Sequence, residues 1–288
     1  MKKIVTFILL LCMVLTLSAC GKVEITMQEI YDANQTEALL KNHQIVFIRD
    51  EMDGELFSEI YLTKEYAYNY FPGSDKESDW AEFMTDDAYY CYMGGDYLRY
   101  LSISPDGVSD FASYRAEHYA AVTLGVDALN DTIESVTKKD GRITVKSVCD
   151  PEALAEFGVT SGKFEYVLDA KTREIISVIS DFTYDDGMAF GSVTEISYNA
   201  EASEMVKTFL EYANQTENLR NITVVSNPGT EKEESKSIQA PKGLIIGLRY
   251  NEDSTYVFDV YTDAACTKAY DPYADTDSNL TIYVKWTK

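Results

Sequence analysis

A series of short segments in which apolar and polar residues alternate constrains the fold of this sequence more than any other feature. Leu56, Ile60 and Leu62 fall on one side of such a segment. A period of two is typical of a strand with one buried face. The predicted strands lie near 43–49, 56–63, 66–71, 87–93, 97–104, 132–138, 141–149, 163–169, 174–184 and 190–198.

Turn residues predict how these strands are connected, and helical periodicity predicts the helices between and beside them. Lys139-Asp140-Gly141 and Asp169-Ala170-Lys171-Thr172 predict hairpins, and consecutive hairpins form an antiparallel meander. Helices are predicted from Thr26 to Leu40, where Thr26 and Glu29 have capping-box spacing, from Ser109 to Thr123, and from Ala202 to Tyr212. We predict an α+β chain: a large curved antiparallel sheet (an incomplete barrel) with helices on one face, plus a small C-terminal β-rich module.

Charge and composition exclude some classes of function. The chain of 288 residues carries a formal net charge of −23, which argues against nucleic-acid binding, since that needs a basic face. Its two histidines, His43 and His118, leave little room for imidazole catalysis or a multi-histidine metal site. Adjacent acids such as Asp185-Asp186 are best interpreted as solvated. No catalytic motif is present, so we predict that the protein is not an enzyme and needs no cofactor.

The N-terminus has the pattern of a secretory signal. Met1-Lys2-Lys3 is followed by an apolar run from Ile4 to Leu17, shorter than the roughly 20 residues of a membrane-spanning helix. Leu17-Ser18-Ala19-Cys20 resembles the lipobox of bacterial lipoproteins. The resemblance implies a signal peptide over 1–19, cleavage before Cys20, and fatty acyl chains such as palmitate on Cys20. It places the protein at the outer face of the bacterial cytoplasmic membrane, facing the extracellular side. The alternative is an ordinary signal peptide with a chance cysteine.

The predicted leading helix, long meander and covering helices of residues 24–200 resemble the LolA-like and LppX-like lipid-binding folds. Thr26-Met27-Gln28-Glu29-Ile30-Tyr31-Asp32-Ala33 is similar to the opening of related Gram-positive lipoproteins. The resemblance implies a body over 20–219 that holds an acyl chain or another amphipathic ligand in a concave sheet. It assigns no ligand-binding residue.

The C-terminal part resembles a different family. Ile222-Thr223-Val224-Val225-Ser226-Asn227-Pro228-Gly229, Val260-Tyr261-Thr262-Asp263 and Leu280-Thr281-Ile282-Tyr283-Val284-Lys285-Trp286 are similar to the internalin B-repeat, a small β-grasp-like module. We therefore place a B-repeat module over 220–288. It implies the alternative function, a surface module that contacts cell wall, glycan or another surface protein without a small-molecule ligand.

The remaining candidate residues allow more than one interpretation. Cys91, Cys149 and Cys266 are either free thiols or partners in a disulfide. Asp275 and Asp277 have the spacing of the first ligands of an EF-hand calcium loop. Leu280 and Trp286 occupy the positions where that loop needs glycine and glutamate, so no metal site is predicted. Weak calcium binding near Asp271 stays open. Clustered tyrosines either line a ligand groove or pack as strand residues whose hydroxyl groups stay exposed to solvent. The clustered tyrosines are Tyr66, Tyr68, Tyr70, Tyr90, Tyr92, Tyr97 and Tyr100.

Overall fold

The computed structural model describes residues 24–104, 107–109, 130–155, 158–249 and 256–287. Within them the chain divides into two compact units, and each has its own apolar core. The first unit comprises the described parts of Met1–Asn34 and Val126–Ala189. The second comprises those of Gln35–Gly125 and Phe190–Lys288.

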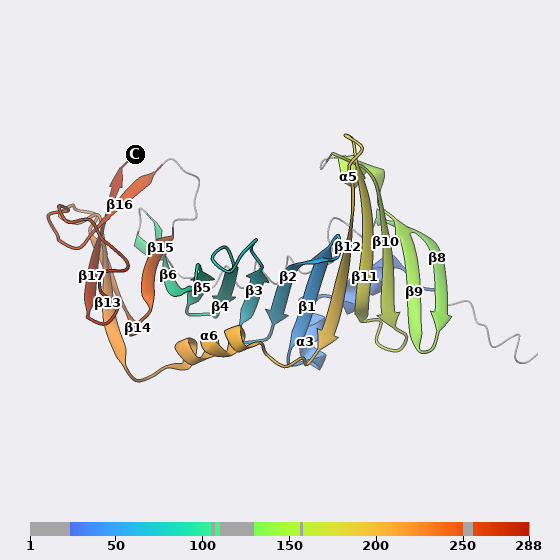
Figure 1. Ribbon diagram of the computed structural model, residues 1–288, viewed down its shortest axis with the longest axis horizontal. Helices are drawn as coiled ribbons and strands as arrows, with labels where there is room; N and C mark the ends of the chain where they lie inside the picture. Colours follow the sequence, from blue (N-terminus) through green and yellow to red (C-terminus); the bar gives the residue numbers. More distant parts are fainter. Residues whose placement is uncertain (1–23, 105–106, 110–129, 156–157, 250–255, 288) are drawn as a thin grey trace, which may run out of the picture. The chain divides into compact units, whose positions relative to one another are not determined.

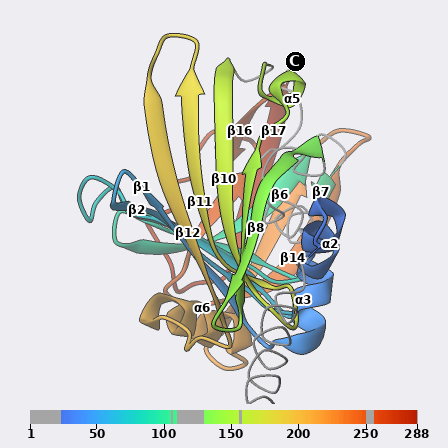
Figure 2. The same ribbon diagram turned by 90° about the vertical axis from the view of Figure 1, so that its right-hand side faces the viewer.

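The first unit contains an antiparallel meander in the order β8–β9–β10–β11 (Figure 1). Figure 2 shows the paired strands β10 and β11 side by side. Both predicted hairpins are confirmed. Asp140 and Gly141 both have positive φ, the conformation that a tight two-residue hairpin turn requires. Asp169 Oδ1 accepts the backbone N–H groups of Lys171 and Thr172 and so fixes the second turn. The elements are β8 (Thr132–Lys139), β9 (Arg142–Val148), α5 (Pro151–Ala155), β10 (Val159–Asp169) and β11 (Ile175–Tyr184).

The leading helix is interrupted, so the prediction of one helix from Thr26 to Leu40 is wrong. The predicted capping box is present: Thr26 Oγ1 accepts the N–H of Glu29, and the Glu29 carboxylate accepts the N–H of Thr26. Helix α2 (Met27–Ala33) then ends at the buried Asn34, and α3 (Thr36–Asn42) follows. The Asn34 amide donates to the carbonyl oxygens of Ile30 and Arg173, while its side-chain oxygen accepts the N–H of Ile175. Asn34 thereby ends the helix and anchors it on the start of β11.

The second unit contains a larger sheet in the order β15–β6–β5–β4–β3–β2–β1–β12, with β7 beside β6 (Figure 1). All neighbours are antiparallel except β15, which pairs with β6 in parallel. The strands are β1 (Val46–Met52), β2 (Glu55–Leu62), β3 (Ala67–Phe71), β4 (Trp80–Met84), β5 (Tyr89–Met93), β6 (Asp96–Ser104), β7 (Gly107–Ser109), β12 (Ala189–Tyr198) and β15 (Ile245–Arg249).

Two helices of this unit cover opposite faces of the sheet. Leu39 and Leu40 of α3 pack with Val46, Ile48 and Leu62. The alternate residues of the same strands face the other way, toward α6 (Glu204–Asn214). The predicted helix from Ala202 to Tyr212 corresponds to α6, displaced by two residues at each end. Strands β1–β3 are therefore covered on both faces where these two helices pack.

A four-stranded C-terminal sheet has the order β14–β13–β17–β16. Ile282 and Val284 alternate inward on the last strand, as predicted, and Trp286 Nε1 donates to Ser226 Oγ at 3.0 Å. The apolar cluster of this sheet includes Leu101 and Ile103 of β6. The boundary at residues 219 and 220 stays a prediction. The strands are β13 (Leu219–Ser226), β14 (Glu234–Pro241), β16 (Val257–Tyr261) and β17 (Leu280–Thr287).

The prediction of an α+β chain with a large sheet and a small C-terminal β-rich module is confirmed. The helices do not lie on one face as predicted, since α3 and α6 pack on opposite faces of the larger sheet. The large sheet is mixed rather than wholly antiparallel, because β15 comes from the C-terminal part and runs in the same direction as β6. Strands β4, β7 and β15 were not predicted. The helix predicted from Ser109 to Thr123, which includes His118, lies almost wholly outside the described residues.

Candidate functional site

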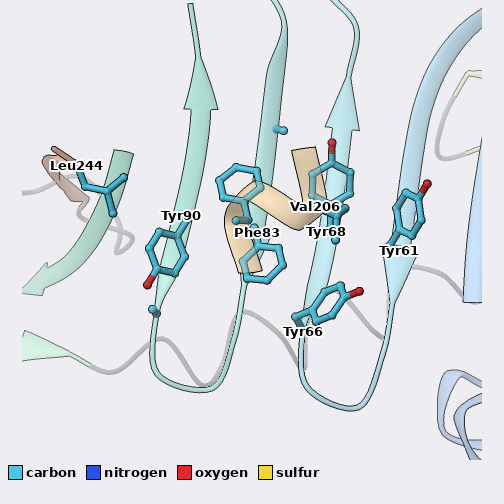
Figure 3. Close-up of a cluster of buried hydrophobic side chains, with 10 residues drawn as sticks. Tyr61, Tyr66, Tyr68, Phe83, Tyr90, Val206 and Leu244 are labelled. Carbon is cyan, nitrogen blue, oxygen red and sulfur yellow. The ribbon is translucent and has the colours of Figure 1, made fainter. Parts of the chain in front are cut away.

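One face of the larger sheet is lined by aromatic rings, and we call it the aromatic face (Figure 3). Its central row crosses the strands at paired positions: Tyr61 beside Tyr68, then Phe83, then Tyr90, then Arg99. The row is straight because each residue is the register partner of the next, and side chains of paired residues point to the same side. The clustered tyrosines named from the sequence belong to this face except Tyr100, which packs with Met84 and Tyr89.

Helix α6 covers the aromatic face. Ser203 caps its N-terminus, since the Ser203 hydroxyl accepts the N–H of Val206. Val206 and Phe209 are fully buried, and the Phe209 ring stacks on Phe83 with centroids 5.3 Å apart and 9° between planes. Tyr97 meets Phe209 edge-on at 5.2 Å. The aromatic face is thus filled by a helix of the same chain.

Burial keeps the tyrosine hydroxyls of this face protonated. Loss of solvent raises the pKa of Tyr66, of Tyr68 and of Tyr90 above the ordinary value near 10. The Tyr68 hydroxyl also contacts Met205 Sδ on α6 at 3.2 Å. Of the two interpretations left open by the sequence, packed strand tyrosines describe this face better than a solvent-filled ligand groove.

These tyrosines should make the second unit sensitive to alkali. A phenol whose pKa is raised by folding stabilises the folded state fully below the unfolded pKa, about 10, and loses that contribution as pH rises toward the folded value. We expect buried tyrosines to ionise only as the unit unfolds, so tyrosinate absorbance and loss of near-ultraviolet circular dichroism should coincide above about pH 10. Gradual ionisation of all tyrosines with the dichroism intact would contradict the burial described here.

A pocket of about 480 Å³ opens at the edge of the aromatic face, and we call it the edge pocket. It lies between the α3–β1 connection and the β2–β3 turn. Its apolar lining comes from both clusters of the sheet: Leu40 belongs to the α3 side, while Ile45 and Tyr66 belong to the α6 side. The lining residues are Leu40, Lys41, Asn42, His43, Gln44, Ile45, Thr63, Lys64, Glu65 and Tyr66.

Hydrogen bonds hold both walls of the edge pocket. Thr63 Oγ1 accepts the N–H groups of Glu65 and Tyr66 and fixes the β2–β3 turn. On the other wall, the His43 ring stacks on Tyr198 with centroids 4.3 Å apart. The backbone N–H of Gln44 donates to Asn199 Oδ1 at 2.7 Å. The pocket is therefore built by ordered turns, which suits a preformed binding site.

The charges around the edge pocket differ from those of the whole chain. Lys41 and Lys64 lie on its rim, and Glu65 is the one acid among its lining residues. The complete chain has 48 acids against 25 lysines and arginines. A site that gathers two ammonium groups in so acidic a chain favours a ligand with a negatively charged group.

The opposite face carries an exposed apolar strip, formed by Phe57, Phe71, Trp80 and Met93 on neighbouring strands. Phe71 stacks on Trp80 at 5.4 Å and meets Phe57 edge-on at 6.3 Å, and Met93 is the register partner of Trp80. Phe57, Trp80 and Met93 are 50%, 37% and 48% exposed. Contiguous exposed aromatics of this kind are typical of interaction surfaces.

The predicted lipidation site Cys20 and the signal peptide lie outside the described residues. In the described part of the chain, no helix is long and apolar enough to cross a membrane. Cys91, Cys149 and Cys266 are free thiols. Burial raises the pKa of Cys91 and that of Cys149 to about 11, so both are protonated at neutral pH.

The acidic residues considered as calcium ligands accept backbone hydrogen bonds within their own loop. Asp271 Oδ1 accepts the N–H of Tyr273, and Asp275 Oδ1 accepts those of Asp277 and Ser278. These backbone hydrogen bonds, chiefly that from Ser278, lower the pKa of Asp275 to about 2. Over the described ranges, no three histidine, cysteine or acidic side chains lie together as a metal site would need.

Comparison with known proteins gives similarity of fold alone. No protein-family model and no curated protein matches the chain. Among solved structures, LprF from Mycobacterium bovis is 15% identical with a TM-score of 0.34, and the match covers 64% of this chain and 97% of LprF. An uncharacterized conserved protein from Thermus thermophilus is 13% identical with a TM-score of 0.34, and the match covers 62% of this chain and 91% of that protein.

A LolA superfamily protein from Nitrosomonas europaea is 10% identical with a TM-score of 0.24, and the match covers 64% of this chain and 97% of that protein. The fold is thus similar to those of LprF and of a LolA superfamily protein, at low scores. The resemblance of Asn221–Trp286 to a B-repeat stays a prediction, as does lipidation at Cys20. The edge pocket was not predicted, because its two walls are separated in sequence and carry no motif.

Proposed function

We propose that this chain is a non-catalytic binding protein, anchored by lipid on Cys20 at the outer face of the bacterial cytoplasmic membrane, whose edge pocket holds an amphipathic ligand with a negatively charged head. The observation that carries the proposal is the pocket itself. Its volume of about 480 Å³ falls within the roughly 300–1,000 Å³ of small-molecule sites. Since α6 fills the aromatic face, the pocket at its edge is the better place for a ligand.

The lining of the pocket suits the two ends of such a ligand. Leu40, Ile45 and Tyr66 offer apolar surface for an acyl chain, and each belongs to or packs on a larger apolar cluster. Lys41 and Lys64 offer ammonium groups to a carboxylate or phosphate head. A ligand so placed would keep its head in water and its chain against the protein.

Removing the two ammonium groups should weaken binding of a negatively charged probe but not binding of a neutral one. In the double variant Lys41→Gln/Lys64→Gln we expect the affinity for a fluorescent fatty acid to fall roughly two- to thirtyfold, since each of the two exposed ionic contacts is worth about 0.2–1 kcal/mol. The affinity for the corresponding fatty alcohol should not change. Fluorescence titration of the Cys20→Ser protein provides the measurement.

The matched control is Lys232→Gln/Lys236→Gln, which removes the same charge from exposed positions of the C-terminal part. Equal weakening by both double variants would show that net charge, and not the edge pocket, governs binding. Protein that is recovered without lipid in native mass spectrometry, and that binds neither probe, would overturn the proposal.

The exposed apolar strip supports a second candidate, a surface that contacts cell wall, glycan or another surface protein. Phe57 and Trp80 present partly exposed rings in one continuous strip. Under this function, Phe57→Ser/Trp80→Ser would abolish retention on purified cell wall and leave fatty-acid binding unchanged. Retention that is unaffected by the double variant would count against it.

A further inference from the structure

The row of paired side chains across the aromatic face ends in a charged residue, Arg99 of β6. Its guanidinium lies over the Tyr90 ring, 5.8 Å from the centroid, and Arg99 Nη1 donates to the carbonyl oxygen of Gln239 at 2.6 Å. Arg99 Nε is buried without a hydrogen-bond partner. A guanidinium has five N–H donors, so donors remain besides the one that the carbonyl oxygen of Gln239 accepts.

Arg99 also lacks a carboxylate partner. Within the described residues, no acid lies within ion-pair distance of its guanidinium, although the chain carries 48 acids. Asp87 acts on Arg99 electrostatically without forming an ion pair. Arg99 is partly buried, and the cost of holding a partly buried cation without a counter-ion is offset when an anion binds it.

Arg99 lines a second pocket, of about 250 Å³, which we call the arginine pocket. Three parts of the second unit converge there: the β4–β5 turn, the C-terminal end of α6, and β13 with β14. Besides Arg99 and Asp87, its lining residues include the aromatic residues Tyr90 and Tyr212 and the polar residues Asn214, Gln215 and Gln239. An aromatic wall beside a guanidinium suits a planar anionic group.

We infer that the arginine pocket binds a small monocarboxylate, whose two oxygens take the unused donors of Arg99. The carboxylate matches a guanidinium in geometry as well as charge, since two parallel N–H···O bonds form in one plane. Asp87 on the same pocket disfavours a second negative charge, so a dianion such as phosphate should bind less well. This site is separate from the edge pocket, and no lining residue is shared between them.

Benzoate and its neutral isostere benzamide test this site, because they differ only in the group that meets Arg99. In saturation-transfer NMR with the full mature chain carrying Cys20→Ser, we expect saturable benzoate binding, at least tenfold weaker benzamide binding, and weaker binding of inorganic phosphate than of benzoate. Arg99→Gln should weaken benzoate binding at least tenfold. Arg142→Gln, which removes an exposed arginine from the first unit, should leave it unchanged.

A second variant, which should strengthen benzoate binding instead of weakening it, tests the site even if Arg99→Gln does not fold. Asp87 is exposed, and we expect Asp87→Asn to strengthen benzoate binding about two- to fivefold by removing a repulsive charge. Absence of saturable benzoate binding, equal binding of benzamide, or tighter binding of phosphate would overturn the inference. An Asp87→Asn variant that binds benzoate no better than the parent would also overturn it. This outcome does not depend on whether the edge pocket binds a ligand.

Discussion

Replacing Phe209 with alanine should destabilise the second unit by about 3–5 kcal/mol, the usual cost of removing a fully buried phenylalanine. Phe209 is 0% exposed and lies against Phe83, Tyr97, Tyr68 and Tyr90. Its removal leaves a cavity between α6 and the aromatic face that the rigid strands cannot close. Urea unfolding followed by near-ultraviolet circular dichroism measures the loss, because the dichroism reports on the packed tyrosines.

The matched control is Glu211→Ala on the same helix. Glu211 is exposed, so its replacement should change the free energy of unfolding by no more than about 0.5 kcal/mol. If Phe209→Ala cost as little as Glu211→Ala, α6 would not be the cover of the aromatic face. The edge pocket would then be only part of a larger open groove.

Replacing Cys20 with serine should move the protein from the membrane fraction to the medium. Each buried methylene of an acyl chain contributes about 0.8 kcal/mol to membrane binding, and two or more chains together give stable anchoring. Serine cannot form the thioether, so both the anchor and its contribution are lost. Fractionation of cells followed by immunoblotting measures the distribution.

The same experiment separates the two interpretations of the N-terminus. With an ordinary signal peptide, the parent protein would already be in the medium and Cys20→Ser would change nothing. Retention of the variant in the membrane fraction would show that another part of the chain holds it there.

Local signals predicted local structure well. The Asp-Gly pair at Asp140 and Gly141 predicted a turn whose positive φ angles the structure has, and the Thr26–Glu29 spacing predicted a capping box that forms. Both depend on side chains within three residues of one another. Alternation likewise placed most strands of the large sheet, because one buried face imposes a period of two.

Features that depend on distant residues could not be predicted. Strand β4 was missed because Glu82 is buried in it and bonds to the Tyr89 hydroxyl, whereas an acid in a sequence is normally interpreted as solvent-exposed. The break at Asn34 depends on Arg173 and Ile175, far along the chain. The helix signal there was correct on both sides of the break.

The two pockets could not be predicted for the same reason. The walls of the edge pocket come from the α3–β1 connection and the β2–β3 turn, and neither stretch contains a binding motif. From the sequence, an arginine on strand β6 is interpreted as solvent-exposed. Only the structure shows that Arg99 lies against Tyr90 with a buried Nε. Its pocket forms where Gln239 of β14 lies against Arg99 of β6.

Photolabelling with a fatty acid that carries a diazirine on its chain tests the central claim most directly. Peptide mapping of the labelled protein should place the label within residues 40–45 and 63–66, and excess unlabelled fatty acid should prevent it. Label that resists competition, or that maps to strands away from the edge pocket, would contradict the account.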